Sequence, residues 1–302
     1  MDNAPNATAT ISPASAPRRL AALIKSPGLS YLMEAHDGLS AAVAREVGFS
    51  ALWASGLSIS SSLGYRDANE VSWTQLVEVV DRIAEVSGLP VLVDGDSGFG
   101  NFNNARLLAL KLRQRGAAGV CLEDKQFPKM NSFIGDRHAL ADIAEFSGRL
   151  KAIKDATGED LVLVARIEAL IAGYGMHEAL ERADAYADAG ADAILIHSRK
   201  SEADEILTFA RSWKRLPIVI VPTKYYATPV SAYRDAGIST VIWANHAMRA
   251  AVAGMRQTCE RIRQEDSIAG IETEVASLNE VFDLFGYDEL ANAERHYMPQ
   301  AG

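Results

Sequence analysis

The sequence contains few cysteines and no long apolar segment. Only Cys121 and Cys259 occur among 302 residues, so we expect no disulfide framework of the kind that small secreted proteins use. No apolar run reaches the roughly 18 residues that a membrane-spanning helix needs. These absences predict a cytoplasmic protein in a reducing environment, without a membrane partner.

Basic residues are fewer than acidic ones. The chain has 30 Lys and Arg against 39 Asp and Glu, which gives a formal net charge of −9. A protein with this balance has no general attraction for nucleic acid or for an anionic membrane, and we expect neither as a partner. A small anionic ligand would have to be held by a local group of cationic side chains or by a metal.

The N-terminal segment lacks the pattern of a folded element. Residues 1–19 are rich in Ala, Pro, Ser, Thr and Asn and have no apolar centre like that of a secretory signal. We therefore expect residues 1–19 to be a disordered extension and residues 20–302 to form one domain. With 48% hydrophobic residues, a chain of this length can bury a substantial core.

Short apolar runs alternate with amphipathic segments from Leu29 onward. Near-continuous apolar runs are typical of parallel strands that are buried on both faces. Helical patterns between them include residues 105–115, 140–156 and 178–189. A glycine commonly follows the helix, because the residue that ends a helix often has a left-handed backbone conformation, which favours glycine. The expected strands are residues 30–34, 51–54, 91–94, 119–123, 161–166, 193–197, 218–221 and 240–243.

Eight such units in about 240 residues favour a (β/α)8 barrel of the TIM type. An open doubly wound sheet is the alternative, but no glycine-rich phosphate loop follows the first strand. Helical sequence continues beyond the eighth strand, at residues 246–264 and 275–285. We interpret these extra C-terminal helices as a region for association between subunits.

Carboxylates collect after the third and fourth expected strands. Asp94 and Asp96 are two residues apart, so on an extended chain they would point the same way, and Glu123 ends the next strand. Asp and Gly also cluster in turns for conformational reasons, so the Asp94–Asp96 pair alone leaves both interpretations open. Glu123 favours a metal site, and three carboxylates without nearby His or Cys suit a hard cation such as Mg2+.

Other polar residues also stand at strand ends, which converge on one face of a barrel. Arg166 and His197 end the fifth and sixth strands. The arginine could form a structural salt bridge with Glu168 or Glu123, and the histidine could be a core residue whose hydrogen bonds are made within the protein. Beside a bound anion, the arginine and the histidine would instead hold it by positive charge or hydrogen bonds.

The ten residues from Glu123 to Ser132 carry the most specific signal. Two carboxylates, two lysines and an Asn-Ser pair follow a buried strand here, in the order E-D-K-x5-N-S. With this run, the chain resembles the isocitrate lyase and phosphoenolpyruvate mutase superfamily, and within it the mutase family, over about residues 29–299. The other matching segments are residues 33–36, 53–58, 100–104, 165–169, 196–198, 221–226 and 243–246. One departure is Gly95-Asp96-Ser97, where the family usually has Ala-Asp-Thr.

The resemblance implies roles for several residues. It implies that Asp94 binds Mg2+ directly and that Asp96 and Glu123 act largely through the waters of the ion. A mobile gate would extend over about residues 124–139, and Asp67 would lie at the reacting centre. It also implies that Trp53 lies at the substrate and that backbone groups of Gly56 and Leu57 hold the substrate carboxylate. Lys129 and Ser132 would belong to the gate, with Asn131 placed on it as well. The residues implied around the phosphoryl group are Ser55, Asn131, Arg166 and His197.

The resemblance also implies a reaction and an assembly. The reaction is intramolecular transfer of the phosphoryl group of phosphoenolpyruvate from the enol oxygen to C3, which gives phosphonopyruvate, as in phosphonate biosynthesis. The assembly is a dimer of dimers in which the eighth helix is exchanged between subunits.

Three alternatives remain at this point. Phosphonopyruvate hydrolases share the scaffold but tend to lack the asparagine of the Asn-Ser pair. Lyases that act on 2-hydroxy acids carry a K-K-C-G-H loop, whereas residues 124–136 contain no cysteine here. A catalytically silent protein would bind Mg2+ and an enolate mimic without turnover.

Overall fold

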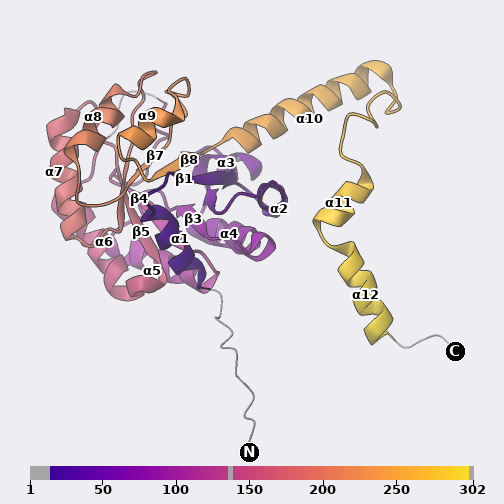
Figure 1. The fold of residues 1–302 in the computed structure, drawn as a ribbon, viewed down its shortest axis with the longest axis horizontal. Helices are drawn as coiled ribbons and strands as arrows, with labels where there is room; N and C mark the ends of the chain where they lie inside the picture. Colours follow the sequence, from indigo (N-terminus) through magenta and orange to yellow (C-terminus); the bar gives the residue numbers. More distant parts are fainter. Residues whose placement is uncertain (1–13, 135–138, 299–302) are drawn as a thin grey trace, which may run out of the picture.

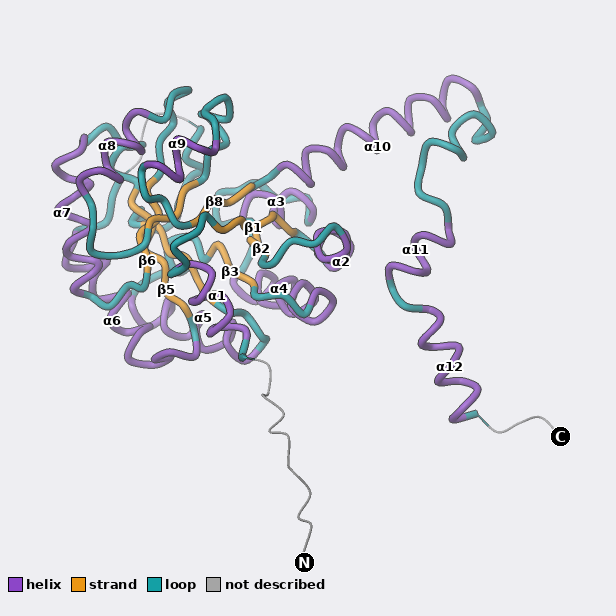
Figure 2. The backbone as a smooth tube through the Cα atoms, in the orientation of Figure 1, coloured by secondary structure: helices purple, strands orange, loops and turns teal. Residues whose placement is uncertain are grey.

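The expected barrel is present. The computed structural model describes residues 14–134 and 139–298, and its parallel strands form one closed barrel in chain order, with β8 paired to β1. Figure 1 shows the helices arranged around this barrel, and Figure 2 shows the strands at its centre. The strands are β1 (Ser30–Ala35), β2 (Leu52–Ala54), β3 (Val91–Asp94), β4 (Gly119–Glu123), β5 (Val162–Ile167), β6 (Ala193–Ile196), β7 (Ile218–Ile220) and β8 (Thr240–Trp243).

Side chains cap the starts of α5 and α6, and this explains the small errors in the boundaries expected for these two helices. Helix α5 begins before residue 105 because the Asn101 side chain accepts hydrogen bonds from the Asn103 and Asn104 amides. Helix α6 begins after residue 140 because Asp142 caps it in the same way. The helices around the barrel are α2 (Gly38–Glu46), α3 (Gly56–Ser62), α4 (Trp73–Ser87), α5 (Phe102–Gln114), α6 (Ile143–Thr157), α7 (Gly175–Asp188), α8 (Asp204–Ser212) and α9 (Val230–Asp235).

Helix α1 (Ala16–Ile24) corrects the expected N-terminal boundary. Its Leu20 and Ile24 are buried in the barrel interior, in one cluster with Leu92 and Val164. A Cβ on Gly119 would lie 2.8 Å from Leu20 Cδ2, so the glycine at the start of β4 makes room for the helix. The expectation of disorder is therefore wrong over residues 16–19, while residues 1–13 lie outside the described part of the chain.

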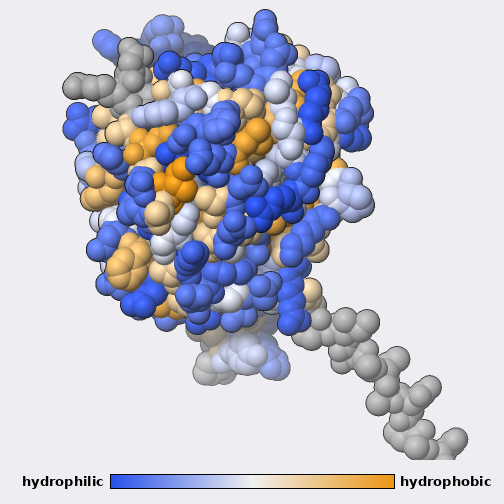
Figure 3. All heavy atoms as spheres, turned by 90° about the vertical axis from the view of Figure 1, so that its left-hand side faces the viewer, coloured by the Kyte–Doolittle hydropathy of each residue, from blue (hydrophilic) through white to orange (hydrophobic). Residues whose placement is uncertain are grey.

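Of the C-terminal helices, the first extends away from the barrel (Figure 1), and the second ends near α2, where Arg45 Nη2 donates to the Leu284 carbonyl at 3.3 Å. They are α10 (His246–Glu265), α11 (Leu278–Leu284) and α12 (Tyr287–Tyr297), and none of the three has a buried residue. Their apolar side chains are largely exposed, with Leu278 at 72% and Met255 at 60%. By contrast, the barrel face on the α7 side is mainly hydrophilic, with apolar side chains in small groups (Figure 3).

Among the described residues, no helix is both long and apolar enough to cross a membrane.

Candidate active site

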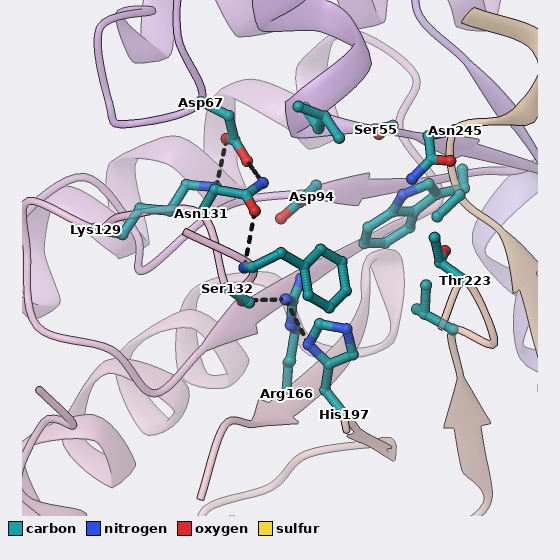
Figure 4. A pocket seen from close by; sticks show the side chains of 15 residues that line it. Ser55, Asp67, Asp94, Lys129, Asn131, Ser132, Arg166, His197, Thr223 and Asn245 are labelled. Carbon is teal, nitrogen blue, oxygen red and sulfur yellow. Dashed lines mark hydrogen bonds and ion pairs between the residues drawn. The ribbon is translucent and has the colours of Figure 1, made fainter. Parts of the chain in front are cut away.

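A cavity opens at the carboxyl ends of the strands, where barrel active sites lie. Ten of the thirteen expected site residues line it, and Figure 4 shows several of them converging from different strands and loops. The lining residues are Trp53, Ser55, Leu57, Asp67, Asp94, Lys129, Asn131, Ser132, Phe133, Arg166, His197, Val221, Thr223, Ala244 and Asn245.

The other three expected residues lie directly beside the cavity. Asp96 Oδ1 is 2.7 Å from Lys129 Nζ, and Glu123 Oε2 is 3.4 Å from Arg166 Nη2. The Gly56 amide lies 3.4 Å from Asp94 Oδ2. A Cβ at position 56 would come within 3.1 Å of the same oxygen, so this close approach favours glycine.

The turn after β3 differs from the extended geometry expected for it. Asp96 has a left-handed backbone with φ of 48°, and its amide lies 3.3 Å from Asp94 Oδ1. A turn, rather than strand alternation, therefore brings the two aspartates together. Gly95 fits this turn, because a Cβ there would lie 2.7 Å from Val120 Cγ2.

Burial makes the carboxylates after β3 costly to ionise. It raises the pKa of Asp94, against the opposing charges of Lys129 and Arg166. It raises the pKa of Asp96 to about 7, again against Lys129. Although burial disfavours the charged form of Lys129, Asp96 and Asp67 hold its pKa well above the ordinary value. The ammonium group is therefore firmly positive between these aspartates.

The charges around the cavity suit an additional cation. Carboxylates outnumber cationic side chains by two here, and Glu123 Oε1 is buried without a hydrogen-bond partner. All of the donors are carboxylate oxygens, which hard cations prefer. Within residues 14–134 and 139–298, no three such groups are already placed around one point. The carboxylates are Asp67, Asp94, Asp96, Glu123 and Glu168, and the cations are Lys125, Lys129 and Arg166.

The opposite wall of the cavity is an arginine–histidine–glutamate group. Arg166 Nε donates to Glu168 Oε1 at 2.6 Å, and Arg166 Nη2 lies 2.9 Å from His197 Nδ1. His197 Nδ1 is also 2.8 Å from Glu168 Oε1. Burial lowers the pKa of His197, so the neutral imidazole is favoured. Arg166 is thus paired with Glu168 and Glu123 while one edge of it lines the cavity.

The described part of the expected gate lies over the cavity and contacts Asp67. Lys129 Nζ is 2.6 Å from Asp67 Oδ1, and Asn131 Nδ2 donates to Asp67 Oδ2 at 2.5 Å (Figure 4). Ser132 Oγ donates to Glu168 at 2.7 Å and accepts from Lys125. Burial opposes ionisation of Asp67, but Lys129 and Asn131 hold its pKa below the ordinary value. Residues 135–138 of the expected gate lie outside the described chain.

A buried arginine connects the first residue of the gate to the segment just after the gate, and the sequence analysis did not predict this contact. Arg182 Nη1 on α7 donates to Asp124 Oδ2 and to the Ala141 carbonyl, both at 3.0 Å. Tyr186 Oη donates to the same Asp124 oxygen at 2.8 Å. The other Asp124 oxygen accepts from the Glu168 amide at 2.8 Å. The sequence offered one indication of this site, because Arg182 and Tyr186 are four residues apart and so lie on the same face of one helix.

Sequence reasoning also assigned no role to Asn69, Phe133, Thr223 and Asn245. Thr223 Oγ1 and Asn245 Oδ1 are buried without hydrogen-bond partners at the edge of the cavity. The Phe133 ring lies edge-on to His197, with 5.4 Å between centroids. Thr223 and Asn245 follow strands and were recognisable as polar strand ends. Asn69 and Phe133 lie in loops whose path the sequence does not determine.

Known proteins resemble this chain over most of its length. Residues 20–263 match the family model described as phosphoenolpyruvate phosphomutase. The chain is 52% identical over 279 residues to the phosphoenolpyruvate phosphomutase of Tetrahymena pyriformis, covering 91% of this chain and 93% of that protein. It is 53% identical over 286 residues to that of Streptomyces hygroscopicus, covering 94% and 91%.

A hydrolase is a more distant relative. The phosphonopyruvate hydrolase of Variovorax sp. is 40% identical, with coverage of 92% of this chain and 98% of that protein. Among solved structures, a phosphoenolpyruvate phosphomutase from Streptomyces platensis subsp. rosaceus superposes with a TM-score of 0.92 at 41% identity, covering 94% of this chain and 99% of that one. A phosphonopyruvate hydrolase in complex with oxalate and Mg2+ gives 0.89 at 37% identity, covering 95% and 100%. The chain therefore belongs to the phosphoenolpyruvate mutase family.

Proposed function

We propose that this enzyme is an isomerase that interconverts phosphoenolpyruvate and phosphonopyruvate. The observation that carries the proposal is Asn131 on the gate, held 2.5 Å from Asp67 across a cavity whose opposite wall is Arg166 and His197. This arrangement places amide, guanidinium and imidazole groups around one small volume. The enzyme resembles the mutases more closely than the hydrolase in sequence, which supports the same assignment.

In the proposed reaction, no proton needs to be transferred. The bond between phosphorus and the enol oxygen breaks, and its electron pair stays on that oxygen, which gives pyruvate enolate and a metaphosphate-like group. C3 of the enolate then attacks phosphorus, and the C2–O bond becomes a ketone. Asp67 suits such a reaction because its lowered pKa keeps it ionised, so it orients Lys129 and Asn131 instead of donating a proton.

We assign the phosphoryl group to the part of the cavity that Arg166, His197, Asn131 and Ser55 surround. Arg166 supplies positive charge in a buried site, where preorganised charge is most effective. His197, held by Glu168 at 2.8 Å, supplies a fixed hydrogen-bonding edge. Trp53 and backbone groups of Gly56 and Leu57 are assigned to the carboxylate end. Ser132, bound to Glu168 and Lys125, fixes the gate.

We further propose Mg2+ as the cofactor, held by Asp94 directly and by Asp96 and Glu123 largely through waters. The proposal is supported by the all-carboxylate donor set and by Glu123 Oε1, which is buried without a hydrogen-bond partner. When bound, Mg2+ would stabilise the negative charge that develops on the enolate oxygen.

The gate distinguishes the proposed mutase from a hydrolase. Water must be excluded while the enolate presents C3 to phosphorus, because otherwise the metaphosphate-like group would be hydrolysed. With the gate over the cavity, Lys129 and Asn131 both contact Asp67, so these contacts favour closure. A lyase is disfavoured because no cysteine lies in residues 124–136.

The proposal is tested by supplying phosphonopyruvate and Mg2+ and following phosphorus NMR. Phosphoenolpyruvate is expected as the main product, with little inorganic phosphate. Phosphate as the main early product, without phosphoenolpyruvate, would identify a hydrolase. Absence of turnover together with retained binding of Mg2+ and oxalate would identify a silent protein.

We also propose that α10 is exchanged between subunits in a dimer of dimers. In a (β/α)8 barrel the eighth helix covers the last and first strands, but α10 has no buried residue and points away from the barrel. Tyr31 and Trp243 stack on the outer side of β1 and β8 with 6.0 Å between centroids, and both remain only partly buried. A partner's helix would cover this apolar face. The unpaired cysteines, of which Cys259 is exposed, support a cytoplasmic location.

A further inference from the structure

Asn69 lies on the loop between α3 and α4 and bonds to two parts of the candidate site. Its Nδ2 donates to Asp96 Oδ2 at 2.7 Å. Its Oδ1 accepts from the backbone amide of Lys129 at 2.6 Å. One planar amide therefore joins a proposed Mg2+ carboxylate to the backbone of the gate.

The same two partners are joined a second time by the Lys129 side chain. Lys129 Nζ is 2.7 Å from Asp96 Oδ1, while Asn69 binds the other oxygen of that carboxylate. The contacts thus form a closed ring. Asn69 binds the Lys129 backbone and Asp96, and the Lys129 ammonium binds the same Asp96. With the gate backbone next to Asn69, one oxygen of Asp96 accepts a hydrogen bond from Asn69 and the other is paired with the Lys129 ammonium.

The backbone of Asn69 is suited to this position. Its φ of 55° lies in the left-handed region, which asparagine tolerates better than most residues. The side chain is partly buried, and its oxygen and nitrogen face opposite partners. The same loop also contains a salt bridge in which Arg66 Nε donates to Glu70 Oε1. We call this pair the loop brace, and it contacts neither the gate nor Asp96.

We propose that Asn69 is a positioning residue that couples gate closure to the orientation of Asp96. When the gate backbone docks on Asn69, the amide fixes Asp96 for its part in holding Mg2+. When the gate lifts, Asn69 loses the Lys129 amide and Asp96 loses the Lys129 ammonium together. The inference rests on the proposed function, since it assigns Asp96 to the Mg2+ site.

Asn69→Gly is the most informative variant, because glycine adopts a φ of 55° without strain. The substitution removes both hydrogen bonds of the Asn69 side chain, to Asp96 and to the Lys129 amide. Glu70→Gln is the matched control, because it removes the negative charge that pairs with Arg66 on the same loop without touching Asp96 or Lys129. Three quantities are measured for each protein. They are hydrogen–deuterium exchange of the peptide over residues 126–133, Mg2+ affinity by calorimetry without substrate, and the share of inorganic phosphate formed from phosphonopyruvate.

For Asn69→Gly we expect exchange of the gate peptide to rise by at least about ten-fold. We expect Mg2+ affinity to fall by about ten- to a hundred-fold, as loss of an outer partner of a metal-binding residue typically causes. The phosphate share should rise several-fold, and Glu70→Gln should stay within about two-fold of the parent in every measurement, because a simple loop brace has none of these effects.

Faster exchange with unchanged Mg2+ affinity would overturn the coupling, because Asn69 would then only brace the gate. Unchanged exchange, or equal effects in Glu70→Gln, would overturn it as well. If the parent enzyme releases mainly phosphate, the proposed mutase function fails instead. Exchange and calorimetry would still test the coupling in that case, because neither depends on turnover.

Discussion

At the scale of single residues, Asn131 is the side chain that separates the two candidate reactions. We predict that Asn131→Ala lowers isomerisation by about two orders of magnitude, comparable to the loss of one preorganised donor in other enzymes. The phosphate share should rise, because Asp67 keeps only Lys129 as its gate partner. Phosphorus NMR of initial rates gives both numbers. Isomerisation at the parent rate would make Asn131 a bystander.

Asp94 is the residue on which the metal assignment depends most. Exhaustive chelation should abolish activity, and added Mg2+ should restore it. Among Asp94→Ala, Asp96→Ala and Glu123→Ala, the first should be the most damaging, because it removes the proposed direct ligand. Activity assays before and after chelation check both statements, and full activity after chelation would contradict the metal assignment.

His36 gives a prediction about pH. Its Nδ1 lies 2.6 Å from Glu34 Oε1, and this hydrogen bond, against burial, raises the pKa of the histidine. Because the pKa of His36 is higher in the folded state than in the unfolded state, protonation of His36 stabilises the fold. This stabilisation is fully present below the unfolded pKa of about 6.5 and is lost as the pH rises through the folded pKa. Urea unfolding should therefore show His36→Gln to be more destabilised at pH 6 than at pH 9. An equal difference at both pH values would show that protonation of His36 contributes nothing.

At the scale of elements, the Asp124–Arg182 pair fixes the base of the gate. Arg182→Met should cost about 3–5 kcal/mol of unfolding free energy, because it leaves a buried carboxylate without its cation. Replacing both partners, as in Asp124→Leu with Arg182→Met, should recover part of that loss. Chemical denaturation of the two variants measures the difference. A loss below about 1 kcal/mol in the single variant would mean that water or Tyr186 already satisfies Asp124.

The sequence predicted elements better than it predicted their ends and contacts. Strands such as β3 and β4 were predicted at their observed bounds, because apolar runs buried on both faces leave a strong pattern. Helix α1 was missed because its N-terminal turn is made of Ala, Pro and Arg, and only docking against Gly119 shows why it folds. Asn69 and Arg182 were missed for a related reason, since their partners are 27 and 58 residues away in the chain.

At the scale of the whole molecule, the C-terminal arm formed by α10 to α12 predicts the assembly. Deleting all residues after Ala244 should give insoluble protein, because the outer side of β1 and β8 would lose the helix that we propose a partner supplies. Light scattering of the full chain should give a tetramer. A stable, monomeric and active truncation would refute helix exchange.

Helix α1 lies at the end of the barrel opposite the catalytic mouth. Its residues contact the start of β1, where Ser30 Oγ donates to the Leu23 carbonyl, and the loop before β3, where Arg19 donates to the Gly88 carbonyl. A surface linker or fluorescent reporter attached ahead of Ser15 would therefore be tethered on the side away from the gate. Immobilisation through the start of α1 should therefore leave the mouth of the barrel facing the solution, whereas attachment to α12 would place the support on the C-terminal helices.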